Sequence, residues 1–183
     1  IRYLVRSRGL GDVYKRQDLY LGIECGLEDV LLKQDKGNTL AEAELAIQRL
    51  HGAGIEYDAH IMTGICGRGR WQENAAVLAG FFNRTMPKRI CNFSLFIHRE
   101  SLLYQDMLHG SFHPADELET LQEELALLKQ LHGFACVYDG LHDFVPAHIR
   151  GNLPEDQEKM CRHLIREIHR LEADPSLIKT AIV

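Results

Sequence analysis

The chain has 183 residues, of which 45% are hydrophobic and 26% charged, and its formal net charge is −5. This length fits one ordinary domain, and the apolar content suffices for a buried core, which excludes intrinsic disorder. The acidic balance gives no basic surface for nucleic acid, so none is indicated as a partner. No apolar run approaches the roughly 18 residues of a membrane span, and the first residues lack a signal-peptide pattern. We therefore expect a cytoplasmic protein without a membrane partner.

Residues 1–17 differ in character from the rest of the chain. They contain five Arg or Lys and no acid before Asp12, and they show no amphipathic period. The string VRSRGLGDVYKRQ resembles a translated sequencing adapter of the kind found at the ends of reading frames from fragmentary assemblies. We therefore expect this segment to be non-native, with the natural protein interrupted upstream of Asp18. The alternative is a genuine basic N-terminal arm.

From Asp18 onward the hydrophobic pattern alternates strands with helices. Thr39 and Glu42 form a capping box, which predicts that a helix begins there. In chain order the predicted elements are a strand at 19–23, a helix at 40–50, a strand at 55–64, a helix at 72–82 and a strand at 89–97. Strands separated by helices pair in parallel through right-handed crossovers, so we expect a parallel sheet.

The second half of the chain is predicted to be mainly helical. We expect a loop after residue 97 and then a helix from about Asp116, whose leucines form core while the charges opposite them form a solvated face. The stretch FACVYDG (134–140) is compatible with one more short strand. A terminal helix is predicted over 152–174, with Pro154 in its first turn.

These elements leave two architectures open. A complete eight-fold β/α barrel needs about 250 residues, whereas three clear β/α units follow Asp18 here. The chain is therefore either a small open α/β sheet or one half of a barrel.

Glu24 stands at the end of an apolar strand, where parallel β/α proteins collect their ligands. Gly64 and Ile65 occupy the end of the next predicted strand. An ionised Glu only accepts hydrogen bonds, and one carboxylate can accept from two hydroxyl groups, which suits a ribose cis-diol or another polyol. The alternative is structural: Glu24 caps a neighbouring helix, or pairs with Arg68 or Arg70.

Three linked motifs resemble the radical S-adenosylmethionine (radical SAM) superfamily. The stretch LYLGIECGLEDVLLKQDKGNT is similar to the family's fourth strand, which reads as an apolar run, Gly-x-Glu-Ser-Gly, a leucine-rich turn and KG-(H/N)-T. The stretch DAHIMTGICGRGR resembles the fifth strand and its glycine turn, and NFSLFIHRESLLY resembles the sixth strand and the following loop. The resemblance implies an α/β fold, the C-terminal portion of a partial (β/α)6 TIM-like barrel with parallel strands, plus a helical C-terminal tail.

The resemblance also divides the chain into three parts. Residues 1–17 are the non-native segment, 18–133 form the C-terminal half of the radical SAM barrel, and 134–183 form a helical C-terminal extension. Within that extension, His142, Asp143 and His148 precede a Gly-x-Leu-Pro-x-Asp-like motif similar to that of a bacterial radical-enzyme subgroup. We interpret them as helix packing, with substrate-side architecture as the alternative.

The resemblance implies a binding site for S-adenosylmethionine. In the family the Glu of the fourth-strand motif binds the ribose, so this role is carried over to Glu24, with Gly22 and Cys25 as its motif neighbours. Cys25 replaces the family's Ser, and because a thiol is a weak hydrogen-bond group we interpret it as a packing position. The turn after the fifth strand contacts the adenosine, which carries Gly64 and Ile65 into the site.

His60 occupies a position where some members, such as the oxygen-independent coproporphyrinogen dehydrogenases, have an acidic ribose ligand. An imidazole there can still donate or accept a hydrogen bond. The alternative is a half-buried structural histidine.

The family's CxxxCxxC loop, whose three thiolates hold a [4Fe-4S] cluster, does not occur in this sequence. We expect that loop in a missing upstream half, so the chain carries no metal ligand or catalytic residue of its own and is expected to be inactive alone. The intact parent would cleave S-adenosylmethionine reductively to a 5'-deoxyadenosyl radical, with an electron from a donor such as a ferredoxin or flavodoxin. The sequence does not identify its substrate.

Two other functions stay open at this point. One is a non-radical β/α-barrel lyase or hydrolase in which Glu24 acts as general base and His60 as its partner. The other is a degenerate barrel that binds a nucleoside-like ligand without catalysis.

Overall fold

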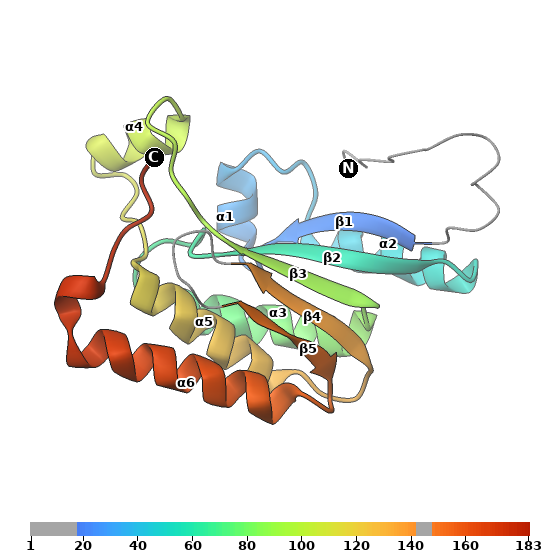
Figure 1. The fold of residues 1–183 in the computed structure, drawn as a ribbon. Helices are drawn as coiled ribbons and strands as arrows, with labels where there is room; N and C mark the ends of the chain where they lie inside the picture. The colour runs from blue at the N-terminus through green and yellow to red at the C-terminus, as the bar shows by residue number, and fades with distance from the viewer. Residues whose placement is uncertain (1–17, 142–147) are drawn as a thin grey trace, which may run out of the picture.

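The structure is a computed structural model that describes residues 18–141 and 148–183. The adapter-like segment 1–17, together with His142 and Asp143, lies outside the described residues. The fold is α/β, with one five-stranded sheet in the order β1-β2-β3-β4-β5 (Figure 1). The strands are β1 (Asp18–Glu24), β2 (Glu56–Thr63), β3 (Arg89–Ser94), β4 (Cys136–Leu141) and β5 (Ile149–Leu153). Strands β1 to β4 are parallel, and β5 is antiparallel to β4.

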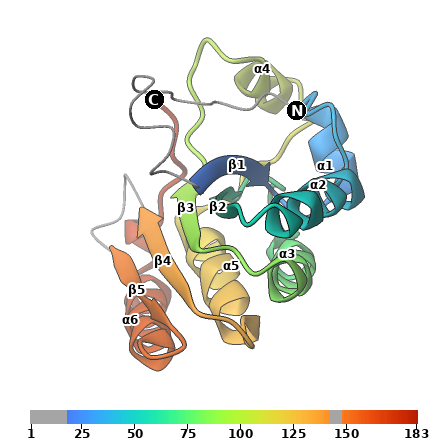
Figure 2. The same cartoon turned by 90° about the vertical axis from the view of Figure 1, so that its right-hand side faces the viewer.

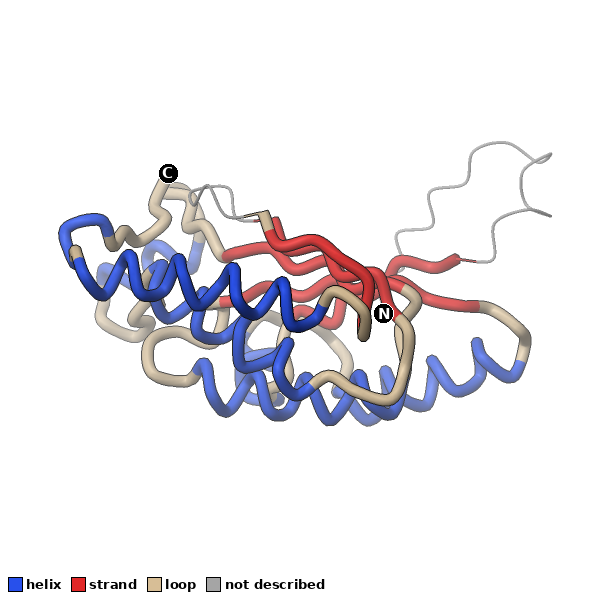
Figure 3. Tube along the Cα trace, turned by 60° about the horizontal axis from the view of Figure 1, so that its bottom comes forward, coloured by secondary structure: helices blue, strands red, loops and turns tan. Residues whose placement is uncertain are grey.

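Six α-helices are described, and the four longest cover one face of the sheet (Figure 3). They are α1 (Glu28–Lys33), α2 (Leu40–Gly52), α3 (Trp71–Thr85), α4 (Leu102–Leu108), α5 (Glu117–Gln130) and α6 (Gln157–Ala173). The short helices α1 and α4 follow β1 and β3 directly, so they lie at the C-terminal ends of the parallel strands (Figure 1). None of the helices in the described part of the chain is long and apolar enough to cross a membrane.

The three predicted strands, the helices between them and the helix after Asp116 are confirmed, and the stretch 134–140 contains β4. The capping box is confirmed too, since Glu42 N donates to Thr39 Oγ1 at 3.2 Å and Thr39 N donates to Glu42 Oε2 at 2.9 Å. The parallel sheet is confirmed for four of the five strands, with β5 as the antiparallel exception.

Part of the helical prediction for 134–183 is wrong. The strand β5 occupies 149–153, where no strand was predicted, and the last helix begins at Gln157 rather than with Pro154 in its first turn. Along β5 the side chains alternate, with Ile149 and Leu153 buried and Arg150 exposed, which is the period-two pattern of a half-buried strand. The short helices α1 and α4 replace segments that we expected to be a turn and a loop.

The core lies between the sheet and the four long helices. Its largest fully buried side chains are Tyr57, Phe81, Phe82 and Tyr138. The same cluster contains Leu21 near the start of the described chain and Leu171 near its end, so apolar residues from both sides of Gly133 pack together.

The other face of the sheet is not covered by a helix within the described residues (Figures 2 and 3). Alternate residues of the strands point to this side, because side chains alternate along a strand. We call it the open face; its members include Tyr20, Gly22, Asp58, His60, Met62, Arg89, Cys91, Phe93, Val137, Asp139, Leu141, Arg150 and Asn152. Most of them are half-buried or exposed, so this face is accessible.

Candidate functional site

The end of β1 has an unusual backbone. Gly22 pairs with His60 and Glu24 pairs with Ile61, so one extra residue bulges between the two pairs. Glu24 itself has φ +65°, in the left-handed region, where an L side chain costs roughly 1–2 kcal/mol. Strained residues of this kind cluster at ligand sites, and the bulge redirects the Glu24 side chain.

The Glu24 carboxylate folds back over Gly22. A Cβ added at Gly22 would overlap Glu24 Oε1 and come within 2.8 Å of Lys36 Nζ. The carboxylate therefore occupies the space that a side chain would fill, on the open face directly across from His60. Glycine at this position allows that close approach.

Lys36 is the partner of Glu24. Its Nζ lies 2.6 Å from Glu24 Oε1, and the two side chains are 26% and 29% exposed. The structural alternative that paired Glu24 with Arg68 or Arg70 is therefore wrong. Lys36 belongs to the KG-(H/N)-T segment of the sequence pattern, but its role as an ion-pair partner was not predicted.

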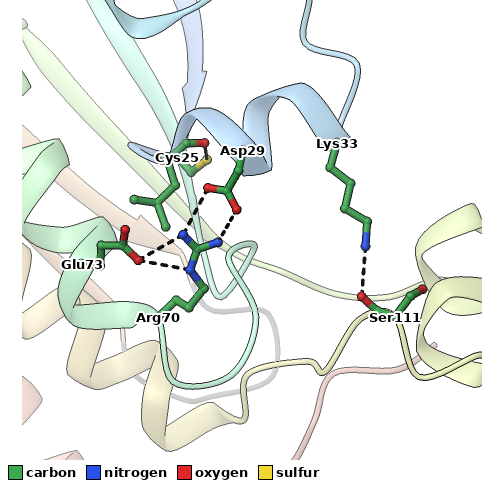
Figure 4. A network of polar contacts seen from close by, with 7 residues as sticks. Cys25, Asp29, Lys33, Arg70, Glu73 and Ser111 are labelled. Atoms are coloured by element: carbon green, nitrogen blue, oxygen red, sulfur yellow. Dashed lines mark hydrogen bonds and ion pairs between the residues drawn. The ribbon is translucent and has the colours of Figure 1, made fainter.

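Arg70 instead joins α1, which follows β1, to the start of α3, which follows β2 (Figure 4). Its guanidinium donates to both oxygens of Asp29 at 2.6 and 3.1 Å and also to Glu73 Oε2 at 3.1 Å. Hydrogen bonds from Arg70 lower the pKa of the Asp29 carboxyl. Lys33 donates to the Ser111 carbonyl at 3.2 Å, which ties α1 to the segment after α4 (Figure 4).

We expect Arg70→Gln to lower the free energy of unfolding by about 0.5–1 kcal/mol, because these ion pairs are largely exposed. The loss should shrink in 1 M salt, where exposed charges are screened. Urea unfolding at low and high salt measures it, with Arg162→Gln as the control that removes a pair within a single helix. An equal loss at both salt concentrations would contradict the electrostatic origin.

Cys25 and Ile65 pack together in a small apolar cluster beneath these loops. The cluster is formed by Cys25, Leu27, Val30, Leu31, Ile65 and Cys66. Cys25 is fully buried, and its thiol lies 3.6 Å from the Leu27 carbonyl. A hydrogen bond between the two thiols lowers the pKa of Cys25 and raises the pKa of Cys66. The structure thus places Cys25 under the site, with its side chain turned to the interior.

Gly64 is held by a buried acid. It has φ +84°, which favours glycine, and its N–H donates to Glu123 Oε2 at 2.9 Å. Asn74 donates to the other oxygen of Glu123 at 2.5 Å and accepts from Gly26 N at 2.6 Å. Burial raises the pKa of Glu123 to about 7. One acid on α5 therefore fixes the turns after both β1 and β2.

The prediction of a solvated charged face on α5 is wrong for Glu123 and Glu124, which are 1% and 0% exposed. The spacing of residues in the sequence could have indicated that Glu124 is buried. Glu124 lies three residues after Leu121 and four before Leu128, and so falls within the leucine stripe. Asn74 carried no comparable signal.

His60 lies in the middle of β2, on the open face. Its ring contacts Tyr20 edge-on at 5.3 Å and Phe93 at 5.7 Å between centroids. Its Nε2 is buried and has no hydrogen-bond partner in the described part of the chain. Within the described residues His60 makes no hydrogen bond to Glu24, so the two groups of the lyase or hydrolase hypothesis are neighbours on the sheet that are not hydrogen-bonded to each other.

The structure brings Gly22, Glu24 and His60 together on the open face and places Gly64 and Ile65 in the adjoining turn. Within residues 18–141 and 148–183, no group of three or more His, Cys, Asp or Glu side chains is arranged to hold a metal ion. No protein-family model matches the chain, and no curated protein matches it.

Proposed function

We propose that this chain is the C-terminal part of a radical SAM barrel and that Glu24 binds the ribose of S-adenosylmethionine. The observation that carries the proposal is the half-buried carboxylate at the C-terminal end of β1. It folds back over Gly22 on the open face, across from His60 of the neighbouring strand, β2. Ligands of parallel β/α proteins gather at this edge of the sheet.

The architecture supports the barrel. Strands β1 to β4 are parallel and follow one another in sequence order, with the long helices on one face. Right-handed crossovers between sequential neighbours place the long connecting helices on the same side, as in a β/α barrel. A doubly wound sheet instead reverses its strand order and carries helices on both faces.

The residues at the end of β1 suit a ribose. The ionised Glu24 carboxylate can accept from two vicinal hydroxyls, and Lys36 balances its charge in this half-buried position. The unpartnered Nε2 of His60 lies on the same face and offers a further hydrogen bond. Gly64 and Ile65 would contact the adenine through backbone and apolar groups.

The iron–sulfur cluster does not fit this chain, because the CxxxCxxC ligand pattern is absent from its sequence. Bound at such a cluster, S-adenosylmethionine supplies one-electron chemistry, for which a ferredoxin or flavodoxin would donate the electron. The residues present here are assigned only to binding and orienting the nucleoside end.

The contacts of Glu24 favour binding over general-base catalysis. A general base must reach the proton that it removes, and its partner must hydrogen-bond to it. Glu24 pairs with Lys36, and the His60 ring packs against Tyr20 and Phe93. Binding of a nucleoside without catalysis would use the same carboxylate; formation of 5'-deoxyadenosine by a reconstituted longer protein separates that function from the radical enzyme.

The test is a thermodynamic cycle between Glu24 and the ribose hydroxyls. We expect Glu24→Gln to weaken binding of S-adenosylmethionine and adenosine at least about tenfold, because hydrogen bonds to a charged group contribute about 1.5–3 kcal/mol. With 2'-deoxyadenosine, which lacks one hydroxyl, the same substitution should have a smaller effect. Calorimetry measures the S-adenosylmethionine affinity, and NMR titration measures the weaker nucleosides.

Glu56→Gln is the matched control, because Glu56 is an exposed acid at the opposite end of the neighbouring strand and pairs with Lys88. It should leave all affinities unchanged. Equal weakening of adenosine and 2'-deoxyadenosine by Glu24→Gln would rule out the ribose contact.

A further inference from the structure

A cavity of about 440 Å³ lies between β5 and α6. Strands β1 and β5 form the two edges of the sheet, so this cavity is at the opposite edge from Glu24. Its lining residues are His148, Ile149, Arg150, Lys159, Met160, Arg162, His163 and Arg166. Three arginines, one lysine and two histidines thus surround it, and none of its described lining residues is acidic.

Four basic residues of α6 line the cavity, and their helical spacing brings them together. Lys159, Arg162, His163 and Arg166 are spaced i, i+3, i+4 and i+7, which places them on one side of α6. Arg150 on β5 also lines the cavity, although its side chain is largely exposed and lies on the open face near Asp139. The buried residues Ile149 and Met160 form the packed wall between β5 and α6. The cations of the cavity therefore come mainly from one side of α6.

Much of this charge is not neutralised by the protein. Arg162 pairs with Glu158, and Arg150 lies 3.6 Å from Asp139. Lys159 and Arg166 have no ion-pair partner among the described residues. Like charges three or four residues apart destabilise a helix, and the chain as a whole carries a net charge of −5. A bound anion would offset this local repulsion.

We propose that the cavity binds the phosphate group of a small phosphorylated molecule. Guanidinium groups bind phosphate oxygens in bidentate fashion, and a lysine adds a compact positive charge. The volume falls within the range of about 300–1,000 Å³ that small-molecule pockets occupy. The proposal does not depend on the function assigned to Glu24.

Calorimetric titration of the 183-residue chain with inorganic phosphate and with pyrophosphate tests the proposal, at constant ionic strength balanced with sodium chloride. Lys159→Gln and Arg166→Gln are the informative variants, since both side chains are exposed and their removal leaves no partner unpaired. Each should weaken pyrophosphate binding about tenfold, as expected for one charge-assisted hydrogen bond.

The control is Arg170→Gln, which changes the same charge on the same helix but lies outside the cavity and pairs with Glu167. It should stay within about twofold of the original affinity. Three results would overturn the proposal: unchanged binding in both cavity variants, an equal loss in the control, or tighter binding of an oligoglutamate peptide than of pyrophosphate. The last would indicate an acidic protein surface as the partner.

Discussion

Glu123→Ala is expected to lower the free energy of unfolding by about 3–4 kcal/mol at neutral pH. The substitution removes the acceptor of the Gly64 N–H and of the Asn74 amide, both buried, and leaves a cavity between α5 and the sheet. Urea unfolding followed by circular dichroism measures the change. Lys129→Ala, an exposed position on the same helix, should change stability by less than about 0.5 kcal/mol.

The raised pKa of Glu123 also predicts how the free energy of unfolding depends on pH. Burial raises its pKa in the folded chain to about 7, above the ordinary value of 4.5, with Glu124 and Glu119 adding to the rise. The folded state therefore binds this proton more tightly than the unfolded state does. The resulting stability is fully present below pH 4.5 and is lost as pH rises through about 7, for a total of about 3 kcal/mol.

Glu123→Gln isolates this contribution, because glutamine does not titrate. The difference in unfolding free energy between the original chain and Glu123→Gln should shift by about 3 kcal/mol between pH 4.5 and pH 8, in favour of the variant at high pH. A difference that stays constant with pH would show that Glu123 does not titrate in this range. Comparing the unfolding free energies of Glu123→Ala and Glu123→Gln then separates the effect of the lost hydrogen bonds from the effect of the lost charge.

The regular part of the fold was predictable because it follows from local rules. The capping box at Thr39 and the apolar runs at 19–23 and 55–64 each specify an element within a few residues of its position. The strand β5 was not predicted because it is only five residues long, from Ile149 to Leu153. The helix that follows has a much stronger amphipathic pattern. Its place depends on pairing with β4, which a local pattern does not encode.

The candidate site was predictable only in part, for a similar reason. Glu24 and Gly64 could be placed at strand ends from the sequence, since the ends of parallel strands meet at one edge. Lys36 and Glu123 could not be assigned as their partners, because these contacts link positions 12 and 59 residues apart. Such pairs arise from packing between elements.

The proposed ribose contact predicts that Gly22→Ala weakens adenosine binding while the chain stays folded. The added Cβ would collide with Glu24 Oε1 and approach Lys36 Nζ, and both atoms are at the far ends of flexible side chains. These side chains can therefore swing away, so the free energy of unfolding should change by less than about 1 kcal/mol. The carboxylate would lose its position over the strand, and adenosine affinity should fall at least about tenfold.

Gly52→Ala is the matched control, since a Cβ there meets no atom within 4 Å and Gly52 is the last residue of α2. It should leave binding unchanged and stabilise the chain slightly. Gly22→Ala and Glu24→Gln should also fail to add when combined, because both remove the same contact. Full adenosine affinity in Gly22→Ala would contradict a ribose contact with the carboxylate in its position over Gly22. Additive losses in the double variant would instead assign Gly22 a separate contact with the ligand.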